Sequence, residues 1–233
     1  MTFLAIILGL LPGFAWLFFY LQEELHPEPK RVIALVFLAG IASAVAALAI
    51  ELFFQCGAFH HFHNCVAGFR KSTALTPLLV LLFAFVEETV KFGAVYFTIR
   101  HNKAFDEPVE AMIYTAVGAL GFATLENLGA LFSGGVRLAL VSGIFEIATF
   151  RFVGTTLLHT LTSSLVGYCW ALGIRNFGSK KFIVYGLILA TILHAAFNYL
   201  ILIFDNLLYP VIFVAIVGFF IFGDFEKLRE RKI

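Results

Sequence analysis

The chain has 233 residues, of which 61% are hydrophobic and only 13% are charged, and its formal net charge is +1. A soluble globular domain has about 45–50% apolar and about 25% charged residues, so this composition excludes one. The small net charge gives no reason to expect nucleic acid or an acidic protein as a partner. We therefore expect an integral membrane protein, surrounded by lipid, whose function depends on where its few charged residues lie.

About seven stretches of the chain are long and apolar enough to cross a bilayer, which takes about 20 mostly apolar residues in a helix. Their apolar runs are continuous and do not alternate with polar residues, which favours helices over barrel strands. The stretches are 3–22, 31–55, 73–99, 111–132, 152–174, 182–204 and 207–223. The sequence thus predicts an all-α, polytopic transmembrane helical bundle.

Two further segments complete the predicted organisation. Residues 134–150 contain Gly134, Gly135, Arg137 and Glu146, which leave too short an apolar run for a span and predict an interfacial or re-entrant helix. The last ten residues, 224–233, are rich in charge and predict a tail beyond the membrane. We therefore expect one integral membrane domain over 1–223, with its motif-bearing core at about 80–200.

Basic residues are unevenly distributed between the two ends of the predicted spans. Only Arg70, Lys71 and Arg137 fall on one side. The other side carries Lys30, Arg31, Arg100, Lys103, Arg175, Lys180, Lys181, Lys227, Arg229, Arg231 and Lys232. Because the side richer in Lys and Arg is cytoplasmic, the bias predicts an extracytoplasmic N-terminus and a cytoplasmic C-terminus.

On this topology the loop 56–72 is extracytoplasmic. It carries Cys56 and Cys65, and an oxidising compartment permits a disulfide between them. The same loop holds three histidines without the regular spacing of metal ligands, which favours a solvated loop over a metal site. These histidines are His60, His61 and His63.

A few ionisable residues lie inside the predicted spans, where an unpaired charge is costly and the residue usually has a function. Glu87, Glu88 and Lys91 form an E-E-x-x-K set, and residues three or four apart on a helix are neighbours. Lys91 can therefore pair with either carboxylate and leave the other available as a base. A purely structural ion pair is the alternative, but it does not explain the second carboxylate.

The remaining polar residues of the spans come from three later helices. They are Glu126 and Asn127 in the fourth span, Arg151, His159 and Ser163 at or in the fifth, and His194 and Asn198 in the sixth. Each histidine has a polar residue one turn further on, and all these groups lie between the midplane and the outer surface. We therefore expect one polar cavity open to the extracytoplasmic side. Glu51 lies close to the outer end of its span, where it can reach the interface, so we leave it outside this site.

Carboxylates and neutral imidazoles in one cavity suit two ways of hydrolysing a peptide bond. In the first, Zn²⁺ is held by three protein ligands, and the remaining glutamate takes a proton from the water in the fourth position. In the second, Glu87 or Glu88 activates the water without metal, and a histidine and Asn198 stabilise the oxyanion. The zinc ligands of the first would be His159 and His194 with Glu126 or Glu88. Helix spacing does not separate the two.

Two other classes of function are open at this point. Intramembrane Glu and His residues also form proton relays in transporters. Here, however, the polar groups stop near the midplane instead of continuing to the cytoplasmic side. The second alternative is a membrane protein without catalytic activity that acts in immunity or binding.

The order of the motifs resembles that of the PrsW family of intramembrane proteases, which are distantly related to the CAAX prenyl endopeptidase and bacteriocin-immunity group. The resemblance covers about residues 80–200. It rests on the segments EETVK at 87–91, DEPVE at 106–110, GFATLEN at 121–127, Arg151 with His159, and HAAFN at 194–198. It implies site-1 cleavage of a membrane-anchored protein, such as an anti-sigma factor, on the extracytoplasmic side of a bacterial cell membrane.

The resemblance also bears on the roles of single residues. The catalytic candidates are Glu87, Glu88, Glu126, His159, His194 and Asn198, and the supporting candidates are Lys91, Asn127 and Arg151. CAAX-type relatives carry a histidine where this chain has Glu126. The family is described as metalloproteases, whereas related structures suggest a glutamate-activated water without metal, and we slightly favour the second mechanism. Asp106, Pro108 and Glu110 are expected to shape the cytoplasmic loop and to cap the fourth helix.

Overall fold

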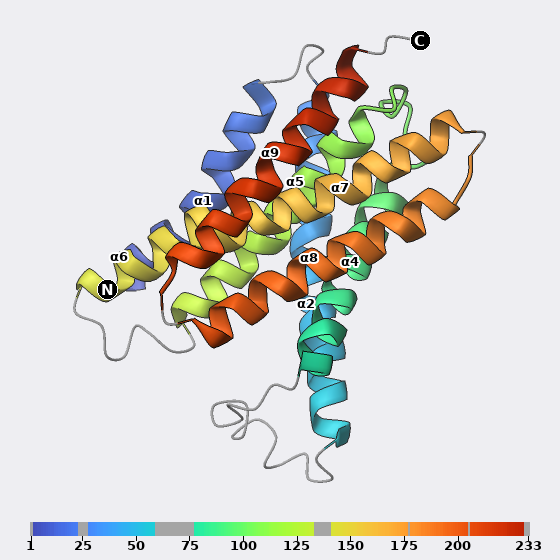
Figure 1. The fold of residues 1–233 in the computed structure, drawn as a ribbon. Coiled ribbons are helices and arrows are strands. Elements are labelled where there is room, and N and C mark those ends of the chain that lie inside the picture. The colour runs from blue at the N-terminus through green and yellow to red at the C-terminus, as the bar shows by residue number, and fades with distance from the viewer. Residues whose placement is uncertain are drawn as a thin grey trace.

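The computed structural model describes residues 2–22, 28–58, 77–132, 141–176, 178–204 and 206–230. Within these ranges every regular element is a helix, which confirms the predicted all-α fold (Figure 1). The α-helices are α1 (Thr2–Gln22), α2 (Lys30–Ala58), α4 (Pro77–Ile99), α5 (Glu110–Ala130), α6 (Val141–Phe150), α7 (Thr156–Arg175), α8 (Lys181–Ile203) and α9 (Leu208–Glu230). The π-helix η2 (Arg151–Thr155) joins α6 to α7.

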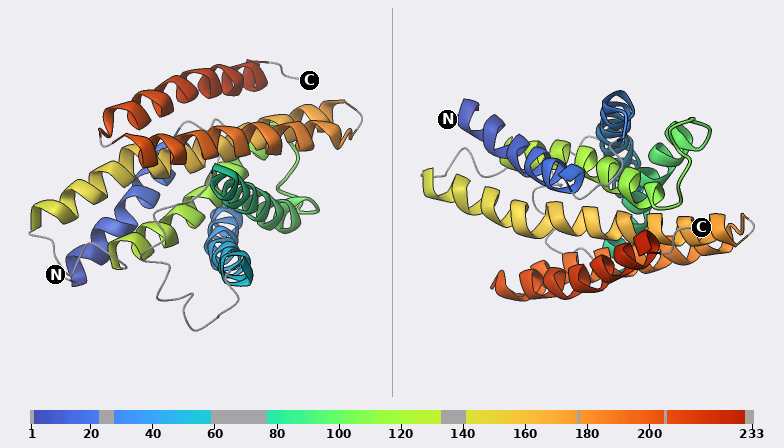
Figure 2. Two further views of the ribbon diagram at one scale, coloured as in Figure 1. Left: turned by 60° about the horizontal axis from the view of Figure 1, so that its bottom comes forward. Right: turned by 90° about the horizontal axis from the view of Figure 1, so that it is seen from above.

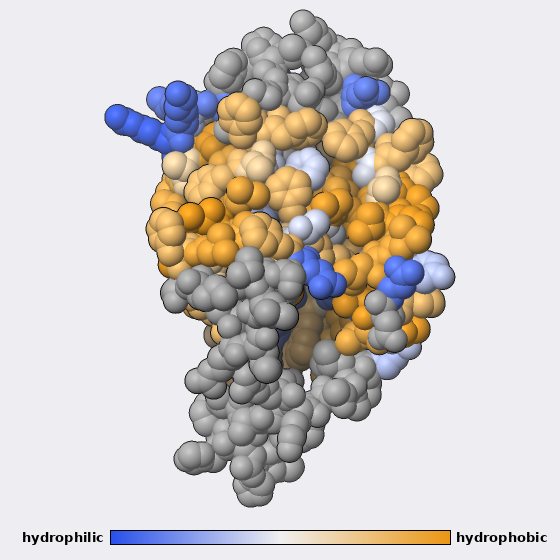
Figure 3. Space-filling view, turned by 90° about the vertical axis from the view of Figure 1, so that its left-hand side faces the viewer, coloured by the Kyte–Doolittle hydropathy of each residue, from blue (hydrophilic) through white to orange (hydrophobic). Residues whose placement is uncertain are grey.

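The helices are those of a membrane protein, and the prediction of about seven spans is confirmed in part. Among the described residues, three stretches are long and apolar enough to cross a bilayer, and two shorter apolar helices accompany them. The three are Lys30–Phe54, Phe145–Arg175 and Lys181–Ile203, and the two are Phe3–Phe19 and Leu208–Asp224. Many large apolar side chains point outward, and hydrophobic residues cover most of the described surface on the side seen in Figure 3. Such a surface is suited to lipid and not to water.

Several helix boundaries differ from the prediction, and two of them change the predicted organisation of the chain. The segment expected to form a separate interfacial or re-entrant helix at 134–150 instead continues, from Val141 onward, through η2 into α7. Its one charged residue in this part, Glu146, is exposed, so nothing in the segment interrupts the helix. At the other end of the chain, α9 runs to Glu230, so residues 224–230 of the expected tail extend the last helix.

α5 is the central helix of the bundle and packs against α1, α2, α4 and α7 (Figures 1 and 2). Every residue of α5 from Glu110 to Thr124 is buried, although the helix has no strongly apolar face. The glycines and alanines of α5 permit this central position, because such small side chains let the backbones of neighbouring helices approach closely. α7 and α8 lie side by side along most of their length. These packed helices hold the polar residues of the site in fixed positions.

The close packing of α2 against α5 requires a residue without a Cβ atom at position 121. A Cβ atom at Gly121 would overlap the backbone carbonyl oxygen of Phe37. We expect Gly121→Ala to lower the free energy of unfolding by about 1–3 kcal/mol, because the backbones would have to separate. Gly129, on the same helix, has nothing within 4 Å of such a Cβ, and Gly129→Ala should be neutral or stabilising by up to about 1 kcal/mol. Thermal unfolding of both variants in detergent measures the difference, and equal shifts would contradict this account.

Most basic residues of the described chain, apart from Lys91 and Arg151 in the interior, gather at one end of the bundle, which we call the basic end. α2 begins there at Lys30, α7 ends there at Arg175 and α8 begins there at Lys181 (upper side of Figure 1). At the same end the Glu110 carboxylate accepts hydrogen bonds from the backbone N–H groups of Asp106 and Glu107, at 2.8 and 3.1 Å. The predicted loop-shaping role is thus confirmed for Glu110.

Several predictions concern the opposite end, where the loop at 59–76 lies outside the described residues. The side chain of Cys56 and all of Cys65 fall there, so the possible disulfide stays a prediction. The same holds for the three histidines of that loop, and for the side of the membrane on which each end lies.

Candidate active site

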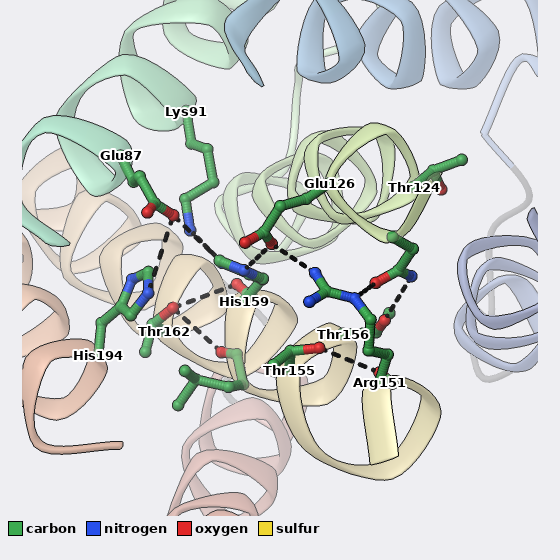
Figure 4. A network of polar contacts seen from close by, with 12 residues as sticks. Glu87, Lys91, Thr124, Glu126, Arg151, Thr155, Thr156, His159, Thr162 and His194 are labelled. Carbon is green, nitrogen blue, oxygen red and sulfur yellow. Dashed lines mark hydrogen bonds and ion pairs between the residues drawn. The ribbon is translucent and has the colours of Figure 1, made fainter. Parts of the chain in front are cut away.

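Four helices bring the predicted polar residues together in the interior of the bundle. α4 contributes Glu87, Glu88 and Lys91, α5 contributes Glu126, α7 contributes His159 and α8 contributes His194. Figure 4 shows the side chains of Glu87, Lys91, Glu126, His159 and His194 turned toward one another. Both histidine side chains are almost fully buried. Residues up to 106 positions apart in the sequence are thus in direct contact.

Glu88 is the most heavily bonded residue of the cluster and its carboxylate is fully buried. Its Oε1 accepts from Lys91 Nζ at 2.7 Å and from His194 Nδ1 at 2.8 Å. The hydroxyl of Thr162 lies 3.0 Å from the same oxygen, and that of Ser163 lies 3.5 Å from Oε2. Because three donors converge on its Oε1, this carboxylate is suited to orienting Lys91 and His194.

The contacts of His159 define its tautomer. Its Nδ1 lies 3.0 Å from Lys91 Nζ and its Nε2 lies 2.7 Å from Glu126 Oε2. An ammonium group can only donate, so Nδ1 must accept and carries no proton. The ring proton is therefore on Nε2 and is donated to Glu126. His159 is held as a neutral imidazole between a cation and a carboxylate.

Glu87 differs from Glu88 and Glu126 because one of its buried oxygens, Oε2, has no hydrogen-bond partner among the described residues. This oxygen lies 3.8 Å from His194 Nε2 and 3.9 Å from His159 Nδ1. These separations are too long for direct hydrogen bonds but suit a small group held between the atoms. Glu87 is thus the carboxylate available for chemistry.

A second set of contacts extends from Glu126 away from the buried cluster. Arg151 Nη2 lies 3.1 Å from Glu126 Oε2, and Arg151 Nε donates to Asn127 Oδ1 at 2.5 Å. Asn127 Nδ2 in turn donates to Thr156 Oγ1 at 3.0 Å. The side chain of Glu126 is 40% exposed, whereas that of Glu88 is fully buried. Access to the cluster is therefore from the side of Glu126.

The π-helix η2 explains how Arg151 and Thr156 can both reach Asn127. In an α-helix, residues five positions apart point in different directions, because each turn takes 3.6 residues. The wider turn of a π-helix brings such residues back to one face. Both side chains then point toward α5. Single π-turns inside α-helices frequently occur at functional sites.

Comparison with known proteins agrees with this geometry. The model of the family described as PrsW family intramembrane metalloprotease matches residues 28–223. The chain belongs to this family. It is 30% identical to the protein named Protease PrsW from Geobacillus kaustophilus over 198 residues, which cover 83% of this chain and 78% of that relative. It is 24% identical to the Protease PrsW of Bacillus subtilis over 235 residues, which cover 99% of this chain and 95% of the relative. No solved structure matches the chain.

Family membership confirms the resemblance seen in the sequence and makes this membrane protein an intramembrane protease. It also disfavours the transporter and the non-catalytic alternatives.

The structure places most of the predicted site residues in one connected network. Asn198 is the exception: it is half-buried on α8, one turn beyond His194, and no contact between the described residues joins it to the cluster. Two contacting residues were not predicted, Thr156 and Thr162. Their signal was present in the sequence, because the run from Thr155 to Ser164 is unusually polar for an apolar chain.

The family's description raises the question of whether these residues fit a metal ion. Glu87, His159 and His194 each offer a ligand atom, and the three atoms lie within 4.8 Å of one another. Tetrahedral zinc, with ligands at about 2.0–2.2 Å, is suited to such a set of one carboxylate and two imidazoles. The unpartnered Oε2 of Glu87 also fits, because a cation would satisfy it.

The outer partners of the histidines support the same fit. Metal-binding histidines usually donate their second nitrogen to a carboxylate. Here Glu88 contacts Nδ1 of His194 and Glu126 contacts Nε2 of His159. These two glutamates, which we expected as possible ligands, thus occupy the nitrogens that face away from the candidate metal position. Lys91 is the competing cation, since its Nζ contacts Nδ1 of His159.

Proposed function

We propose that this protease hydrolyses a peptide bond in a membrane-anchored protein, near the end of the bundle opposite the basic end, with Glu87 as the group that takes a proton from the attacking water. One observation carries the proposal. Glu87 Oε2 is buried without a hydrogen-bond partner among the described residues, while Glu88 and Glu126 each contact a cation and a histidine.

The reaction follows from the positions of these groups. A water between Glu87 and the two imidazoles gives its proton to Glu87, and its oxygen attacks the carbonyl carbon of the scissile bond. Glu87 then returns the proton to the leaving amine. The Asn198 amide, one turn beyond His194, donates to the oxygen that becomes negative.

The remaining residues keep this arrangement in place. Glu88 orients His194 and Lys91, and Glu126 orients His159, so neither imidazole has to reorganise during the reaction. Arg151 neutralises Glu126 at the accessible edge of the site. Glu87, His159 and His194 would hold a zinc ion, which would polarise the carbonyl and make the attacking water more acidic. One oxygen of Glu87 would then serve as a metal ligand, and its other oxygen would remain to take the proton.

The side of the membrane on which the substrate is cut follows from the exposure of Glu126 and from the location of the basic residues. Glu126 lies four residues before the end of α5 at Ala130, far from the basic end, and it is the exposed member of the site. With the basic end in the cytoplasm, the cut lies on the extracytoplasmic side of the membrane. This is the position of a site-1 cleavage, for which an anti-sigma factor is a fitting substrate.

Purified protein in vesicles, mixed with single-pass test proteins that differ in their extracytoplasmic juxtamembrane sequence, tests the proposal. Mass spectrometry of the products should locate one cut near the membrane surface. If no test protein is cut, with or without added zinc, the proposal is wrong. Because the residues fit a metal, we expect chelation to remove activity and zinc to restore it. Unchanged cleavage by metal-free protein would assign water activation to Glu87 alone.

A further inference from the structure

Glu51, which the sequence left outside the site, lies against it in the structure. α2 continues to Ala58, so Glu51 is two turns inside the helix and not at its end. On the same face of α2, Ala47 packs against Val86 of α4 and Phe122 of α5 in one apolar cluster. Glu51 follows Ala47 by one turn.

The neighbours of that cluster are the active-site carboxylates. Glu87 follows Val86 directly, and Glu126 follows Phe122 by one turn. α2 and α5 both begin at the basic end and run in the same direction, so moving one turn along α2 from the apolar cluster brings Glu51 to the level of Glu126. Its carboxyl group is within electrostatic range of both Glu126 and Glu87.

The described residues around Glu51 provide no hydrogen-bond donor for one of its carboxylate oxygens, the buried Oε1. The cations of the site are occupied, since Lys91 bonds to Glu88 and Arg151 pairs with Glu126. A buried, unpaired carboxylate oxygen inside a membrane protein is costly. A donor that arrives with the substrate would remove this cost.

We propose that Glu51 is a specificity-determining residue that binds a basic side chain, Lys or Arg, of the substrate next to the cleaved bond. The guanidinium or ammonium group would donate to Glu51 Oε1 and reduce the repulsion between this carboxylate and those of Glu87 and Glu126. The inference rests on the proposed proteolysis and adds to it a preference for positive charge. It assigns Glu51 to substrate binding and not to the bond-breaking step.

Three sets of purified single-pass test proteins measure this preference. They share one transmembrane segment and carry Arg, Gln or Glu at a single position, scanned over the residues flanking the mapped cut. At one position, the wild type should cleave the Arg protein with a kcat/KM about tenfold above that for the Gln protein, the effect of one charge-assisted hydrogen bond. Glu51→Gln should lose this preference, so that its kcat/KM is the same for the Arg and Gln proteins. Glu51→Lys should prefer the Glu protein.

The control is Glu146→Gln, which removes the same charge from an exposed position on α6 and should keep the wild-type preference. Thermal unfolding of each variant verifies folding. A wild type with no preference for Arg at any position overturns the inference without needing a variant. So does a Glu51→Gln protein that keeps the preference, or one that loses cleavage of all substrates equally. Absence of cleavage by the wild type would instead overturn the proposed proteolysis, and the inference with it.

Discussion

Replacing Glu87 by Gln should reduce cleavage by about 10²–10⁴-fold, the usual contribution of a positioned general base. Gln has nearly the same shape, but its amide cannot take a proton from water at neutral pH. Because Oε2 of Glu87 has no hydrogen-bond partner among the described residues, the substitution breaks no hydrogen bond of that atom. The thermal midpoint should therefore stay close to that of the wild type while kcat falls. Cleavage of a single-pass test protein, together with thermal unfolding in detergent, measures both quantities.

The neighbouring glutamate provides the contrast. Glu88→Gln should lower the thermal midpoint as well as activity, because it weakens the bonds of Glu88 to Lys91 and His194. Glu146→Gln should change neither. If Glu87→Gln cleaved at the wild-type rate, the proton acceptor would have to be another residue.

Replacing Lys91 by Met should lower the free energy of unfolding by about 3–5 kcal/mol, because removal of one partner of a buried ion pair leaves the other charge uncompensated. Lys91 and Glu88 are each only 1% exposed and their charged atoms are 2.7 Å apart. Met fills a similar volume, so the loss is mainly electrostatic. The unfolding of detergent-solubilised protein by a denaturing detergent gives the free energy.

A double variant separates the charge effect from a packing effect. Glu88→Gln with Lys91→Met removes both charges and should recover most of the lost stability while activity stays low. Lys181→Met, at an exposed position at the start of α8, is the matched control and should be neutral. A Lys91→Met protein as stable as the wild type would show that the buried pair contributes nothing to folding.

The sequence was sufficient for the helical fold and for the identity of the cluster. Continuous apolar runs predict membrane helices, and charges inside such runs stand out because they are costly. The spacing of Lys91 from Glu87 and Glu88 predicted an ion pair with one of the two, and the structure contains the pair with Glu88. For such local features, helix geometry alone determines which side chains meet.

The division of roles between Glu87 and Glu88 could not be predicted in the same way. The two residues are adjacent in the sequence and differ only in what α7 and α8 place against them. Glu51 was missed for a related reason: its distance from the predicted end of the span was used to assign it to the interface, but α2 is longer than expected. Contacts between helices and the exact helix ends depend on tertiary packing, which hydropathy does not record.

The continuous rod from α6 to α7 has a consequence for the depth of the site in the bilayer. Its apolar part, Phe145–Arg175, has 31 residues, and at about 1.5 Å per residue it is about 46 Å long. A hydrocarbon layer is only about 30 Å thick, so the rod has to tilt steeply to match it. Each residue then advances only about 1 Å across the membrane, and Arg151 and His159 differ in depth by about 8 Å instead of about 12 Å. Hydrophobic mismatch thus compresses the polar side chains of this rod into a thin layer of the bilayer, and the bond to be cut must enter that layer.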